Sequence, residues 1–273
     1  MTQIIETPTY TLHQGDAPIL ISIPHLGTQL PNELIGDFND EAFQLADTDW
    51  HLDRLYAVVK SLGASLLCAK VSRYAIDLNR PSTGESLYPG QTTTGLCPTT
   101  TFKGAPLYKE GREPTAAEIQ RRVDAYWRPY HDTLKAELSR LRAAHTKVLL
   151  WEAHSIASVL PRLFEGKLPD LNFGTNDGAA CDPALLAAVV APLAQQNAVD
   201  HVVNGRFKGG FITRHFGQPA QGIQAIQLEM CQSLYMNESY PFSYREDLAT
   251  GVQPLLHDML SAGLKHLRGA VTA

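Results

Sequence analysis

The chain has 273 residues, enough for one large domain with a full core, and its 44% hydrophobic and 19% charged residues are typical of a globular protein. A formal net charge of −5 without a basic run excludes a basic surface for nucleic acid or membrane, and no apolar run reaches the roughly 18 residues that span a bilayer. The N-terminus lacks the apolar core of a signal peptide, and four scattered cysteines without a CxxC pair fit a reducing cytosol, so we expect a cytoplasmic protein.

The first part of the chain predicts a strand, a helix and a second strand. Residues 17–25 (APILISIPH) form a short apolar run that indicates a buried strand ending at His25. A helix is expected over 49–63, because its apolar residues share one face: Leu52, Leu55, Val58 and Val59. Residues 64–81 favour a strand with a polar end. The following segment, 82–113, is rich in Gly, Pro and Thr and is expected to be a long ordered loop, whose role as a lid stays open.

The rest of the chain alternates helices and strands. Thr115 and Glu118 form a capping box that opens a long helix, which Pro129 should kink or split. The later segments predict a strand, a loop, a helix, a loop or hairpin, a strand and a closing helix: 147–154, 168–183, 183–197, 205–217, 222–230 and 243–267. This alternation predicts an α/β fold with a mostly parallel or mixed, doubly wound sheet, helices on both faces, and a single domain over residues 1–273.

Four of the expected strands end in residues that carry chemistry. Their ends bring these residues: His25; Asp77, Asn79 and Arg80; Glu152 and His154; and Glu229. The carboxyl ends of parallel strands line up along one edge of a sheet, where open α/β sheets bind their ligands. A lone histidine in such a place is more often a packed core residue. Four strand ends together predict a site.

Two histidines and a carboxylate are a common catalytic zinc set that leaves one position for water. His25 and His154 are the candidate zinc ligands, and Glu229 is the candidate base for a water whose pKa zinc lowers to about 7. The third ligand stays open between Asp49 and Asp53, which lie one turn apart on the expected helix. Asp49 could equally be a helix N-cap or first-turn acid.

A second group of residues indicates recognition of a carboxylate. Arginine can bind a carboxylate through two parallel hydrogen bonds, so Asn79 and Arg80 predict a substrate-binding pair. Asp77 could hold Arg80, or the nearby Arg73, in place. The alternative is a purely structural ion pair at the mouth of a loop.

Two further features concern the same site. In the glycine-punctuated segment 205–217, Arg214 is the candidate for a second anionic clamp, whereas Arg206 and Lys208 are expected in solvent. Ser155, beside His154, could act as a nucleophile only if a base lies within hydrogen-bond reach.

With these residues in view, the sequence resembles the N-formylglutamate amidohydrolases (N-formylglutamate deformylases), the last-step hydrolases of one bacterial route of histidine degradation. The resemblance runs nearly end to end and rests on these segments: PHLGTQLP, DTDWHLDRLY, SRYAIDLNRP, LYPGQTTTGLCP, EAHSIASVLPRLFEGKLPDLNFGT, NGRFKGGFITRHFG and IQLEMCQSLYMNE. This family is distantly similar to the zinc carboxypeptidases and to the aspartoacylase/succinylglutamate desuccinylase group. The resemblance implies the fold of that group, a zinc ion, and a set of site residues: His25 and His154 as ligands, Glu229 as base, and Asn79 and Arg80 as carboxylate binders with Arg73 close by.

One position departs from the pattern of those relatives. They place a glutamate ligand three residues after the first histidine, where this chain has Thr28, so the ligand must come from elsewhere, and Asp49 or Asp53 is the nearest choice. The implied reaction is the hydrolysis of N-formyl-L-glutamate to formate and L-glutamate with zinc or another divalent metal. Two alternatives stay open: a related zinc hydrolase of another acidic N-acyl amino acid or peptide, and a non-catalytic sensor of acidic metabolites.

Overall fold

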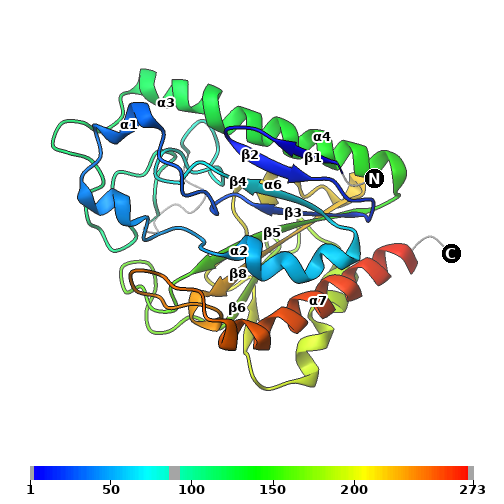
Figure 1. Cartoon of the computed structure of the whole chain (residues 1–273). Coiled ribbons are helices and arrows are strands. Elements are labelled where there is room, and N and C mark those ends of the chain that lie inside the picture. Colours follow the sequence, from blue (N-terminus) through cyan, green and yellow to red (C-terminus); the bar gives the residue numbers. More distant parts are fainter. Residues whose placement is uncertain (1–2, 86–92, 270–273) are drawn as a thin grey trace.

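An eight-stranded mixed sheet runs through the computed structural model, which describes residues 3–85 and 93–269 (Figure 1). The strands are β1 (Ile4–Glu6), β2 (Tyr10–His13), β3 (Ile19–Ile23), β4 (Ser65–Ala69), β5 (Val148–Ile156), β6 (Leu171–Gly174), β7 (His201–Val203) and β8 (Ile223–Cys231). Their order in the sheet is β1-β2-β4-β3-β5-β8-β6-β7. The central block β4-β3-β5-β8 is parallel. β2 joins it antiparallel on one side and β6 on the other.

Helices lie on both faces of this sheet, with α3 and α4 along one face and α7 along the other (Figure 1). The α-helices are α1 (Asn32–Ile35), α2 (Leu52–Leu55), α3 (Ala116–Arg122), α4 (Arg128–Ala144), α5 (Pro183–Val190), α6 (Phe211–Phe216) and α7 (Glu246–Gly269). Short 3-10 segments are η1 (Asp40–Gln44), η2 (Tyr56–Leu62), η4 (Ala191–Gln195), η5 (Pro219–Gln221) and η6 (Gln232–Leu234), and η3 (Val123–Trp127) is a π turn. Among the described helices, none combines the length and the apolar character needed to cross a membrane.

The central strands are apolar on both sides because each side packs against helices. On β5, which is buried along its whole length, Trp151 packs with residues of α2, α5 and α7. Its neighbour Leu150 points to the opposite face and packs with residues of α4 and α6. Strands buried on both faces have continuous apolar runs, as in 148–151. The prediction of a mixed, doubly wound α/β sheet with helices on both faces is confirmed.

The helix expected after residue 115 forms with an interruption before Pro129. Its N-cap is Thr115, whose side-chain oxygen accepts the backbone N–H of Glu118 at 3.3 Å. The chain then passes from α3 through the π turn η3 into α4, and Pro129 lies in the first turn of α4. Proline has no N–H to donate, and a π turn just before it accommodates the lost hydrogen bond without ending the helix.

Residues 71–80 do not form the strand that the sequence predicted. β4 ends at Ala69, and Asp77, Asn79 and Arg80 lie in the irregular segment beyond it. The apolar residues of this segment are buried without strand pairing: Tyr74, Ala75, Ile76 and Leu78. A short apolar run indicates burial, and here burial is reached by compact turns.

Other segments also differ from expectation. The helix expected from residue 49 begins at Leu52 and continues as η2, and Gly63 ends it in a left-handed conformation (φ 71°). Residues 171–174 form β6 inside an expected loop, because the carbonyl and amide groups of β8 pair with them. Residues 211–216 form α6 where a loop or hairpin was expected, and β1, β2 and β7 were not predicted. The described parts of segment 82–113 contain no helix or strand, as expected.

Candidate active site

The candidate site lies at the carboxyl ends of the parallel strands. His25 follows β3 by two residues, and His154 is near the end of β5. On the neighbouring β8, Glu229 is in register with His154. Asp49 reaches the same place from the turn before α2, where its backbone N–H donates to the carbonyl of His25 at 3.0 Å. The topology therefore gathers residues that are far apart in the sequence at one edge of the sheet.

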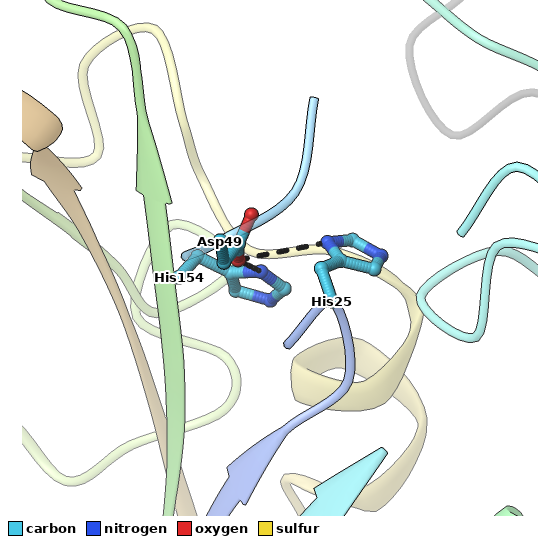
Figure 2. Close-up of side chains that lie close together, drawn as sticks. All are labelled: His25, Asp49 and His154. Atoms are coloured by element: carbon cyan, nitrogen blue, oxygen red, sulfur yellow. Dashed lines mark hydrogen bonds and ion pairs between the residues drawn. The ribbon is translucent and has the colours of Figure 1, made fainter. Parts of the chain in front are cut away.

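His25, Asp49 and His154 form a tight group of metal-ligating side chains. Each offers one ligand atom, and these atoms all lie within 4.8 Å of one another. Asp49 Oδ2 lies 3.0 Å from His154 Nδ1 and 3.8 Å from His25 Nδ1, as the dashed lines in Figure 2 indicate. The three residues are only 1–3% exposed. Two imidazole nitrogens and a carboxylate in such a group could hold a divalent metal.

Each of the two histidines is hydrogen-bonded to a second carboxylate through its Nε2 atom, on the side of the ring that faces away from Asp49. His25 Nε2 lies 2.7 Å from Asp77 Oδ1, and His154 Nε2 lies 2.7 Å from Glu152 Oε1. Donation of the Nε2–H to these carboxylates leaves the Nδ1 lone pair of each ring facing Asp49. Histidines that bind metals have this arrangement, because the carboxylate fixes the ring tautomer and makes the ligand more basic.

Two buried groups in this cluster fit a cation. Within the described chain, Asp49 Oδ1 is buried and has no hydrogen-bond partner, which is costly for a charged oxygen. Burial opposes charge on His154, but its hydrogen bonds to Asp49 and Glu152 raise its pKa well above the ordinary value. By contrast, burial and the positive charge of Arg73 lower the pKa of His25. Protons and metal ions compete for the same imidazole nitrogen. The donor set and the orphaned oxygen together fit a metal ion.

The structure separates the two aspartates between which the sequence could not choose. Asp49 is buried beside both imidazoles, and the backbone N–H of Ser155 donates to its Oδ2 at 3.2 Å. Asp53 lies on α2 with an exposed side chain and does not belong to the ligand group. Thr28, which replaces the glutamate of the relatives, is also exposed. Of the candidates for the third ligand, the chain therefore brings Asp49 to the histidines.

Glu229 lies beside this group and is almost fully buried. It is 8% exposed and lines the same cavity as His25 and His154. Burial raises the pKa of Glu229 to about 8, the positive charge of His154 lowers it, and the negative charge of Asp49 raises it. A carboxyl group with a raised pKa next to a ligand-binding cluster is suited to take up and return a proton.

The cavity is also lined by Arg73, Asn79 and Arg80. Arg73 is buried and donates to Asp77 Oδ2 at 2.7 Å, so Asp77 links Arg73 to His25. The structural ion pair considered from the sequence is thus present for Arg73. Arg80 is half-buried, and its Nε donates to the carbonyl of Thr94 at 3.0 Å.

Asn79 packs beside His154 and is fixed by the backbone of α6. Its Oδ1 accepts the backbone N–H of Ile212 at 2.9 Å, and its side-chain nitrogen lies 3.0 Å from His154 Nε2. Gly210 packs directly on this amide, since a Cβ atom there would lie 2.3 Å from Asn79 Nδ2. The Gly-rich segment before α6 is therefore needed for the close approach of backbone to Asn79.

The two arginines of segment 205–217 are placed differently from expectation, whereas the Lys208 side chain is 42% exposed, as expected. Arg214 lies on α6 with its Nε donating to the carbonyl of Gly209, and it does not line the cavity. Arg206, expected in solvent, is half-buried and lines the cavity wall. The sequence carried no signal for these positions, because Arg214 lies on α6, which was not predicted, and Arg206 is positioned by tertiary contacts such as that with Leu163. Gln227 was also missed, although its position two residues before Glu229 puts both on one side of β8.

Replacement of Ser155 by alanine is expected to leave kcat within about tenfold of that of the unmodified protein. A tenfold change corresponds to about 1.4 kcal/mol in the activation free energy. The Ser155 hydroxyl accepts from Tyr235 at 2.7 Å and lies 3.5 Å from Gln232 Nε2, and neither neighbour is a base that could activate it. Steady-state kinetics of the variant test this expectation. Complete loss of turnover in a folded variant would instead support a serine nucleophile.

The sheet and the site together define an α/β protein of the hydrolase type, with a buried His-Asp-His group that could bind a metal and a glutamate beside it. Comparison with known proteins agrees with this class. The family model for N-formylglutamate amidohydrolase matches residues 17–236, so the chain belongs to the N-formylglutamate amidohydrolase family.

Relatives and solved structures extend this result. The chain is 51% identical over 252 residues to N-formylglutamate deformylase of Pseudomonas putida, covering 92% of this chain and 94% of the relative. It is also 51% identical over 249 residues to the protein of the same name from Pseudomonas aeruginosa, covering 91% of this chain and 93% of the relative. A crystal structure of N-formylglutamate amidohydrolase from Ralstonia eutropha superposes with a TM-score of 0.79 at 27% identity, covering 97% of this chain and all of that one.

Proposed function

We propose that this protein hydrolyses N-formyl-L-glutamate to formate and L-glutamate. The observation that carries the proposal is the buried group His25, Asp49 and His154 next to Glu229, in a chain of the N-formylglutamate amidohydrolase family. The 51% identity to two proteins named N-formylglutamate deformylase supports the choice of substrate. A cavity with arginine side chains suits an anionic substrate.

His25, Asp49 and His154 would hold a divalent metal, and we propose zinc. Two imidazoles with one carboxylate are a common catalytic zinc set, although the same donors accept other divalent metals. When bound, such an ion supplies Lewis acidity and lowers the pKa of a water to about 7. Asp77 and Glu152 orient the two imidazoles for this role from behind.

The residues of the chain then have separate tasks in the hydrolysis. Glu229 takes a proton from the attacking water, whose oxygen forms the new bond to the formyl carbon. The carbon–nitrogen bond breaks, and Glu229 returns the proton to the leaving amine of glutamate. Asn79 and Arg80 bind a carboxylate of the substrate, and the buried Arg73 supplies fixed positive charge for the oxyanion.

The cellular setting belongs to the same proposal. The products of the proposed reaction are glutamate and formate. We place this reaction in histidine degradation, because the family that the sequence resembles acts in that pathway. We place it in the cytoplasm, which is supported by four cysteines that are all free and buried.

A substrate panel tests the proposal. We expect the protein, loaded with zinc, to turn over N-formyl-L-glutamate at least about 10-fold better than N-acetyl- or N-succinyl-glutamate and the N-formyl and N-acetyl aspartates, since one methylene changes specificity by roughly 10- to 200-fold. A chelator should abolish turnover, and added zinc should restore it. Preference for another acyl group would support the related hydrolase, and binding without turnover of any substrate would support the sensor.

A further inference from the structure

The proposed substrate carries two carboxylates, and one arginine cannot bind both. Three arginines line the cavity within the described chain: Arg73, Arg80 and Arg206. Arg73 is buried, is paired with Asp77 at 2.7 Å, and stacks its guanidinium over the Phe102 ring at 4.6 Å. Its guanidinium therefore already has a carboxylate partner within the protein. Arg80 and Arg206 remain as candidates for the two substrate carboxylates.

We infer that Arg206 binds the side-chain carboxylate of the substrate and so sets the preference for an acidic N-formyl amino acid. This inference rests on the proposed function, and it assigns the α-carboxylate, common to all N-formyl amino acids, to Arg80 with Asn79. Arg206 comes from the segment between β7 and α6, whereas Arg80 follows the turns after β4. Two separate parts of the chain thus contribute one cation each to the wall of one cavity.

The position of Arg206 is held from two directions. Its Nε donates to the carbonyl of Leu163 at 3.1 Å, and its guanidinium lies 5.3 Å from the centre of the Phe207 ring. Leu163 and Phe207 line the same cavity. A planar guanidinium whose position is held by the protein loses less freedom on binding a carboxylate than an unsupported side chain, which favours a bidentate contact.

The difference in burial between the two ends of the cavity predicts how the substrate is oriented in it. The ligand group is almost fully buried, and so is Glu229, whereas Arg80 and Arg206 are half-buried. The small formyl group therefore belongs at the deep end, and the charged part of the substrate belongs nearer the mouth, where desolvation of a carboxylate costs less. Other cations of the segment are placed elsewhere: Lys208 pairs with Asp177 at 3.0 Å, and Arg214 does not line the cavity.

Kinetics of Arg206→Gln on two substrates test the inference. The substrates are N-formyl-L-glutamate and N-formyl-L-glutamine, which have nearly the same shape and differ in whether the side chain ends in a carboxylate or an uncharged amide. We expect the variant to lower kcat/KM for the glutamate compound by roughly 10- to 150-fold, mainly through KM, because a charge-assisted contact is lost. We expect kcat/KM for the glutamine compound to change less than about threefold.

Three comparison variants make the result specific. Arg80→Gln should lower kcat/KM for both substrates by a similar factor, because both carry the α-carboxylate. Arg206→Lys should recover part of the preference for the glutamate compound, since it keeps the charge but not the planar fork. Lys208→Gln, in the same segment, should leave kcat/KM for both substrates unchanged. An equal loss on both substrates with Arg206→Gln would overturn the inference, whereas failure of the unmodified protein to hydrolyse N-formyl-L-glutamate would overturn the proposed function itself.

Discussion

Replacement of Glu229 by glutamine is expected to lower kcat about 10²- to 10⁴-fold, the contribution of a positioned acid–base group. Glutamine has nearly the shape of glutamate and fills the same place on β8, but it cannot accept a proton from water. Metal content should be unchanged, because Glu229 does not belong to the ligand group. Steady-state kinetics and metal analysis of the purified variant give both values.

A matched control for this variant is Glu110→Gln, the same change at an exposed position. Its kcat should equal that of the unmodified protein. If Glu229→Gln retained more than a tenth of the original kcat, Glu229 would not be the base, and the role of the buried carboxyl would have to be sought elsewhere in the cavity.

Replacement of Asp49 by asparagine is expected to lower kcat/KM by about 10²-fold or more and to reduce bound metal. Loss of the partners that stand behind metal ligands typically costs 10- to 100-fold, and loss of a direct ligand charge should cost at least as much. The asparagine keeps the size of the side chain but removes the negative charge that lies 3.0 Å from His154 Nδ1. Metal content per chain after dialysis and kcat/KM are the two measurements.

Asp53→Asn is the matched control, because it makes the same change four residues away on an exposed side chain. It should leave metal content and kcat/KM unchanged. The opposite pattern, with loss in Asp53→Asn and none in Asp49→Asn, would show that the ligand group described here is not the metal site.

The sequence predicted the parts of the fold whose signals are local and long. β3 and β5 contain short stretches dominated by apolar residues because helices cover both faces of the sheet. β8 places apolar residues between Gln224, Gln227 and Glu229, and α7 carries a long amphipathic pattern. β6 and β7 have only 4 and 3 residues, and a strand that short is defined by its pairing partners rather than by its own sequence. α6 was missed because the glycines before it indicated a loop, although Ile212 and Phe216 bury one face of it.

The site was predictable where strand ends determine position and not where turns or loops do. The register of β5 and β8 puts His154 beside Glu229, and β3 brings His25 to the same edge. Asp49 could not be separated from Asp53, because one turn of helix gives both a plausible face and only the tertiary fold buries one of them. The positions of Arg214 and Arg206 were unpredictable for the same reason, because the direction of a side chain in a loop is set by contacts such as that of Arg206 with Leu163.

The most direct measurement is X-ray diffraction at the zinc absorption edge from crystals of the zinc-loaded, active protein. The account predicts a strong anomalous peak within bonding distance of His25 Nδ1, His154 Nδ1 and the Asp49 carboxylate, with Glu229 lining the same cavity. A peak at another group of residues, or fully active crystals without a peak at these three side chains, would contradict it.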